Sequence, residues 1–245
     1  MTPRQLLADA LKSIERNRSL VIAFIVLVTA FEVAFTAVEL PFVDQLHEGK
    51  APPGLRAFDL AVQLAHAAIY SALLAVVFAR FGKDIDRPLW KCQSDGEAVS
   101  KYFAPWFVIS LLFLLIQQLL RLSQAQGNAD LQALGLFLFM TLYVLAIPIG
   151  ACIMYHGGFG GAPLSESLKP IGRQIGSVVV VFLVDLGGFL VLIILPAVIP
   201  RDLPLVLAVV APIPLAFIDC LAFAAMWRIC MVNRDSPEDN DYDLF

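Results

Sequence analysis

The stretch SVVVVFLVDLGGFLVLIILPAVI, residues 177–199, decides the fold class of this chain. It is almost entirely apolar and is as long as the run of about 20 residues that an α-helix needs to cross a bilayer. One full charge, Asp185, lies near its middle. A carboxylate at this depth is unfavourable by about 2.5–3.5 kcal/mol. The stretch therefore predicts a transmembrane helix whose polar group must be compensated by another part of the protein.

The composition agrees with a protein that crosses the membrane several times. Of the 245 residues, 59% are hydrophobic and 16% are charged, whereas a soluble domain is about 45–50% apolar and about 25% charged. Pro148, Pro212 and Pro214 lie inside apolar stretches and predict kinks there. We expect an all-α integral membrane protein with six transmembrane helices in three hairpins. The expected spans are 19–40, 58–80, 103–120, 132–155, 177–199 and 203–231.

The chain divides into three segments by composition. Residues 1–18 predict an amphipathic interfacial helix, because apolar side chains recur at helical spacing among basic ones. Residues 19–231 form the six-helix transmembrane domain, and residues 232–245 form an acidic tail that we expect to be disordered and cytoplasmic. Basic residues beside the first and fifth spans are candidates for binding anionic membrane lipids. They are Arg4, Lys12, Arg16, Arg18, Lys169 and Arg173.

The distribution of Lys and Arg predicts the orientation of the spans. Most of the 17 Lys and Arg residues precede the first span, follow the sixth, or lie between the second and third or the fourth and fifth. The opposite side holds only Lys50, Arg56, Arg121 and Arg201. Cytoplasmic loops carry the excess of positive charge. Both termini are therefore expected in the cytoplasm, with the protein in the bacterial inner (plasma) membrane.

Ionisable residues inside the spans are the candidate functional groups. Counting from span midpoints places Glu32 and His66 at one depth, and Asp185 and Asp219 at another. A carboxylate beside an imidazole can form an ion pair or relay a proton. Two carboxylates that face each other in a low dielectric cannot both ionise, so the second pair could carry protons. The alternative for each pair is a structural hydrogen bond between helices.

Familiar catalytic and cofactor motifs are absent from the sequence. No GxSxG, HExxH or Walker motif occurs, and the four Cys residues form no CxxC pair. Only three His residues exist, and His66 alone lies deep in an apolar stretch, so paired axial ligands for a transmembrane haem are missing. We therefore expect no cofactor, no metal and no nucleic-acid partner.

Two short segments resemble a known group of membrane proteins. LLADALKSIERN, residues 6–17, lies before the first span, and PLSESLKPIGRQIG, residues 163–176, lies before the fifth. They resemble six-helix bacterial inner-membrane proteins of the YciC-like type, and the membrane domain attached to some glycerophosphodiester phosphodiesterases. The resemblance implies a six-helix fold. It implies no phosphodiesterase activity, because this chain has no such catalytic domain.

Three functions remain open from the sequence. The first is a non-enzymatic membrane protein, a subunit, assembly factor or lipid-associated scaffold, that contacts lipids and a protein partner through helix faces or the acidic tail. The second is a proton-coupled transporter or permeation protein that uses Asp185, Asp219, Glu32 and His66. The third is an enzyme acting on lipid substrates, although no catalytic motif in the sequence supports it.

Overall fold

The computed structural model describes residues 2–42, 52–85, 94–159, 163–199 and 203–234. All regular structure in these ranges is helical. Of the acidic tail predicted for residues 232–245, residues 232–234 are instead the end of a helix, and residues 235–245 lie outside the described ranges. The helices are α1 (Pro3–Arg16), α2 (Arg18–Glu39), η1 (Leu40–Phe42), α4 (Pro53–Ile85), α5 (Asp95–Gln126), α6 (Ala129–Tyr155), α7 (Leu164–Ser167), α8 (Lys169–Arg173), α9 (Ile175–Val198), α10 (Pro204–Val210) and α11 (Pro212–Arg234).

Six stretches within the described ranges are long and apolar enough to cross a membrane, as expected for a multi-pass membrane protein. They are Arg18–Phe42, Pro53–Ile85, Asp95–Gln124, Ala129–Tyr155, Ile175–Val198 and Pro204–Val232. Helices α4 and α5 extend well beyond the apolar runs that predicted them. The sixth stretch is broken at Ala211, where Pro212 begins α11, while α6 continues through Pro148 without interruption. Proline lacks the amide hydrogen that would continue the helix, and α11 begins with two prolines, Pro212 and Pro214, whereas α6 contains only one.

Helix α11 is the centre of the bundle, because α1, α2, α4, α6 and α9 all pack against it. Its buried face is rich in small side chains such as Ala222, Ala224 and Ala225, which allow neighbouring backbones to approach closely. Phe223 fills the remaining space and stacks on Phe78 of α4 with ring centroids 4.1 Å apart. The core is thus built around the last helix that the structure describes.

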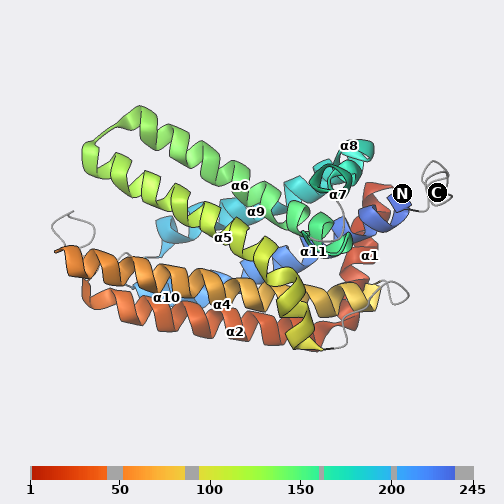
Figure 1. Ribbon diagram of the computed structural model, residues 1–245, viewed down its shortest axis with the longest axis horizontal. Coiled ribbons are helices and arrows are strands. Elements are labelled where there is room, and N and C mark those ends of the chain that lie inside the picture. The colour runs from red at the N-terminus through yellow and green to blue at the C-terminus, as the bar shows by residue number, and fades with distance from the viewer. Residues whose placement is uncertain (1, 43–51, 86–93, 160–162, 200–202, 235–245) are drawn as a thin grey trace.

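Helix α1 lies across one end of the bundle, together with α7, α8 and the end of α11 (Figure 1). A capping box between Thr2 and Gln5 fixes its start. Leu6, Ala10 and Ile14, from the face expected to be apolar, are buried within the protein, whereas Leu11 is 47% exposed. Much of the apolar face of this helix is therefore covered by the rest of the chain.

The α5–α6 connection is a tight turn at the opposite end of the bundle (Figure 1). Gly127 ends α5 with φ of 63°, in the left-handed region that favours glycine. Asn128 then caps α6, since its side-chain oxygen accepts a hydrogen bond from the amide of Leu131 at 3.0 Å. These two residues fix the antiparallel packing of α5 and α6.

Candidate functional site

One face of α4 carries a stripe of polar side chains. Asp59, Gln63, His66 and Tyr70 follow one another at intervals of four, three and four residues, which places them on one side of a helix. The stripe covers about 17 Å at 1.5 Å per residue, roughly half of the hydrocarbon thickness. Each member of the stripe contacts a polar group on another helix or on the next turn. The stripe therefore forms a polar path within an otherwise apolar span.

The first part of the stripe is an ion pair with an attached amide network. Arg121 of α5 donates to Asp59 at 2.8 Å, and the carboxylate of Asp59 is only 8% exposed. The amide of Gln63 donates to both oxygens of Asp59 at 2.9 Å. Gln118 in turn donates to the oxygen of Gln63 at 2.8 Å. These bonds lock α4 to α5 and compensate the charge of Asp59.

The middle of the stripe joins α4 to α2. The ring Nε2 of His66 lies 3.0 Å from Oε1 of Glu32, within hydrogen-bond distance. The ring of His66 packs edge-on against Phe35 and stacks on Tyr70. This contact agrees with the pairing of Glu32 and His66 by depth. It provides a carboxylate–imidazole pair that can hold or release a proton within a span.

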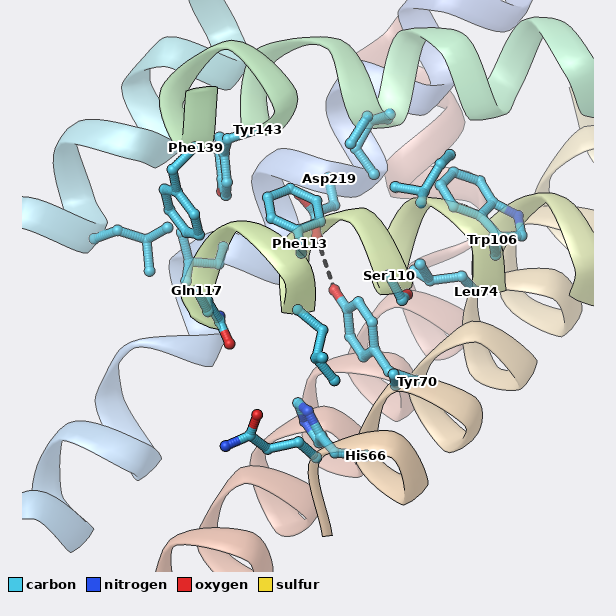
Figure 2. Close-up of a pocket in the computed structure, with 18 of the residues that line it drawn as sticks. His66, Tyr70, Leu74, Trp106, Ser110, Phe113, Gln117, Phe139, Tyr143 and Asp219 are labelled. Carbon is cyan, nitrogen blue, oxygen red and sulfur yellow. Dashed lines mark hydrogen bonds between the residues drawn. The ribbon is translucent and has the colours of Figure 1, made fainter. Parts of the chain in front are cut away.

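The C-terminal part of the stripe reaches α11. The hydroxyl of Tyr70 donates to Oδ2 of Asp219 at 3.3 Å, and Figure 2 shows this bond crossing the space between the two helices. Tyr143 of α6 approaches the same region from the other side (Figure 2) and lies within electrostatic range of Asp219. Asp219 thus accepts a hydrogen bond from a phenol of α4 and lies near a second phenol, on α6.

These polar groups line a pocket between α2, α4, α5, α6, α9 and α11. The pocket is partly open and has a volume of about 300 Å³, with Glu32, Gln63, His66, Tyr70 and Asp219 among its polar lining groups. A second cavity of about 370 Å³ shares the walls formed by Glu32, His66 and Tyr70 and extends toward α10. Binding pockets for small molecules begin at about 300 Å³. The intramembrane polar groups therefore surround a space large enough for a small organic ligand.

Asp185 is not part of the pocket lining. It is 1% exposed, and neither of its carboxylate oxygens has a hydrogen-bond partner in the part of the chain that the structure describes. It lies within electrostatic range of Asp219 and Tyr143, but Asp219 makes its hydrogen bond to Tyr70 instead. The structure thus groups Asp219 with Glu32 and His66 around one pocket, whereas the depth argument placed Asp219 with Asp185.

The six basic candidates for lipid binding are all exposed. Arg4, Lys12 and Arg16 lie on α1, Arg18 begins α2, and Lys169 and Arg173 lie on α8. Both α1 and α8 pack against α11, at the same end of the bundle (Figure 1). Two of the cations have acidic neighbours on their own helical turns, at 3.5 Å for Lys12 with Asp9 and 2.5 Å for Lys169 with Glu166.

The sequence interpretation did not identify Asp59, Tyr70, Arg121 or Tyr143 as members of the site. Asp59 lies at the edge of the span predicted for residues 58–80 and was not considered as a functional group. Its partner Arg121 was assigned to the external side. The spacing of Asp59, Gln63, His66 and Tyr70 was visible in the sequence and could have identified the stripe. Tyr143 gives no such signal, because its closeness to Asp219 arises only from helix packing.

The described residues contain no cluster of three or more His, Cys, Asp or Glu side chains that could hold a metal ion. Comparison of the chain with protein-family models gave no match. Searches of curated proteins and of solved structures gave no match either. The function of the pocket must therefore be argued from its own geometry and chemistry.

Proposed function

We propose that this protein is a proton-coupled membrane transporter that binds its substrate in the pocket between α2, α4, α5, α6, α9 and α11. The observation that carries the proposal is the hydrogen-bonded pair of Glu32 and His66, which lines the same pocket as Asp219. A protonatable pair in the wall of a ligand-sized pocket can couple the binding of a proton to the binding of a solute. Polar groups retained inside spans mark such paths.

The proposal includes the orientation and the membrane. The excess of Lys and Arg supports both termini in the cytoplasm, and the resemblance of residues 6–17 and 163–176 to YciC-like proteins supports a bacterial inner membrane. The three helical hairpins are part of the same topology. On this orientation, the pair of Asp59 and Arg121 lies toward the external side of the pocket.

Proton-coupled solute movement tests the proposal directly. Purified protein is placed in liposomes that contain a pH-sensitive dye, a pH gradient is imposed, and a panel of cationic, anionic and neutral solutes is added outside. We expect at least one class of solute to accelerate proton movement, and Glu32→Gln to abolish this effect because an amide at position 32 can neither take up a proton nor exchange one with His66. Asp130→Asn, the same change at an exposed site outside the pocket, should retain it. Solute-independent dye signals across the whole panel would refute the transporter.

The second candidate function is a lipid-associated scaffold or assembly factor. The observation that favours it is the gathering of six exposed basic residues on α1, α2 and α8 at one end of the bundle (Figure 1). Such a surface can attract anionic headgroups, with each cation contributing about 1 kcal/mol. Affinity purification with and without residues 235–245 tests the protein-partner part of this function. Equal recovery of partners from both forms would show that residues 235–245 are not needed for partner binding.

A further inference from the structure

The pocket is lined by more acidic than basic side chains. Its described lining residues include the carboxyl groups of Glu32 and Asp219 and the imidazole of His66, but no Lys or Arg. Arg121, beyond this lining, donates to Asp59, a different carboxylate. A single imidazole therefore faces two carboxyl groups, and the pocket can receive positive charge from a ligand.

Aromatic side chains form much of the remaining wall. Tyr70 comes from α4, Trp106 and Phe113 from α5, and Phe139 and Tyr143 from α6, and Figure 2 shows all five around the same space. The faces of aromatic rings attract cations electrostatically, by about 2 kcal/mol or more when the site is desolvated. They also provide apolar surface for the body of an organic ligand.

The two acids are placed differently within this wall. Glu32 is bound to His66 at the junction of the two cavities, whereas Asp219 lies deeper and receives the hydroxyl of Tyr70 at 3.3 Å. Asp219 is 8% exposed and lines the pocket. An ionised carboxylate at this depth is stabilised most by a partner that brings a positive charge into the same region of low dielectric.

We propose that the pocket binds a monovalent organic cation with an apolar body, whose charge lies near Asp219 and whose body packs against the aromatic wall. This inference names the substrate class of the proposed transporter and rests on that function only for the movement of the cation. The cation and a proton compensate the same carboxyl groups, so each excludes the other. The fold thus couples cation binding to proton release without a second site.

The groups that determine this competition come from every helix around the pocket. They are Glu32 and Glu39 of α2, Asp59, His66 and Tyr70 of α4, Arg121 of α5, Tyr143 of α6, Asp185 of α9 and Asp219 of α11. Arg121 and Asp59 neutralise each other. The remaining acids outnumber the imidazole, so proton release favours binding of a cation.

Two ions of the same shape and opposite charge test the inference. Tetraphenylphosphonium and tetraphenylborate are bound to purified full-length protein in detergent, with empty micelles subtracted. We expect the cation to bind at least about tenfold more tightly than the anion, and its affinity to rise between pH 6 and pH 8. Equal affinity for both ions, or no binding of either, would overturn the inference.

Substitutions then locate the site. Asp219→Asn should weaken tetraphenylphosphonium binding by about tenfold or more, and Glu32→Gln should reduce its pH dependence. Asp130→Asn, at the exposed start of α6, should change neither. Thermal unfolding of each variant separates loss of binding from loss of fold, and Glu32→Gln replaces Asp219→Asn if the latter does not fold. Unchanged affinity in a folded Asp219→Asn would place the cation elsewhere.

The lipid composition of the membrane distinguishes two possible sources of the natural cation, a lipid headgroup and a free solute. In nanodiscs of phosphatidylglycerol alone, tetraphenylphosphonium should bind as in detergent. Loss of this binding when phosphatidylethanolamine is added identifies an aminolipid headgroup as the occupant, and retention identifies a free cation. Binding without proton-coupled flux would support the cation site and refute the transporter. Proton-coupled flux of another solute without cation binding would support the transporter and refute the cation site.

Discussion

Gly150 of α6 allows Trp106 of α5 to form one wall of the pocket, and a single methyl group there should disturb it. A Cβ atom at position 150 would lie 2.6 Å from Cζ3 and 2.7 Å from Cζ2 of Trp106. Cβ atoms in proteins essentially never lie within 3.0 Å of another such heavy atom. Trp106 is 1% exposed, packs against Phe78 with ring centroids 5.3 Å apart, and donates to the sulfur of Met154. These contacts hold the ring in place, so a clash at position 150 would push it toward the pocket that it lines.

We expect Gly150→Ala to destabilise the protein by about 1–3 kcal/mol, the usual effect of overpacking a well-packed core. A loss of 1 kcal/mol lowers the unfolding temperature of a chain of 150–250 residues by about 2–4 °C. Thermal unfolding of the detergent-solubilised protein measures this shift. The displaced ring would also narrow the pocket, so binding of tetraphenylphosphonium should weaken in the same variant.

Gly187→Ala is the matched control, because nothing lies within 4 Å of a Cβ atom at that position of α9. Replacing a glycine inside a helix by alanine stabilises by about 0.5–1 kcal/mol when no clash occurs. The clash at Gly150 involves the outer ring of the indole, so Trp106→Phe should recover part of the stability lost in Gly150→Ala. Equal unfolding temperatures for Gly150→Ala and Gly187→Ala would refute this account of the α5–α6 packing.

Two other contacts give further predictions. Arg121→Gln leaves the nearly buried carboxylate of Asp59 without its cation and should destabilise by about 1–3 kcal/mol, between the values for exposed and buried pairs. Adding Asp59→Asn should restore much of this stability in chemical or thermal unfolding, whereas additive losses would contradict a direct pairing. Cys152 and Cys230, which are buried with sulfur atoms 3.6 Å apart, should not react with a maleimide in folded Cys92→Ser protein. They should react after denaturation, and rapid labelling beforehand would show that this part of the core is open.

The local features of the fold could be predicted from the sequence because they depend on local chemistry. Apolar length alone locates the helices that cross the membrane, and Pro212 locates the break before α11. Counting residues along the first two spans was enough to place Glu32 and His66 at one depth. Depth needs only the rise per residue, which is constant in a helix.

The partners of Asp219 could not be predicted, because they depend on how each helix is rotated about its axis. Asp185 and Asp219 were placed level by counting, yet the hydroxyl that binds Asp219 belongs to Tyr70, 149 residues away along the chain. Rotation is set by packing of faces such as Phe78 against Phe223. Spans that are apolar on all sides give little indication of which face will be buried.

The contact between α1 and α11 joins the first and the last of the described helices. The guanidinium of Arg228 donates to the hydroxyl of Ser13 at 2.8 Å, across 215 residues of sequence. During synthesis, the apolar face of α1 that includes Leu6 and Ile14 emerges long before α11 can cover it. Burial of this face therefore depends on α11, so α1 can reach its final position only after that helix has been made.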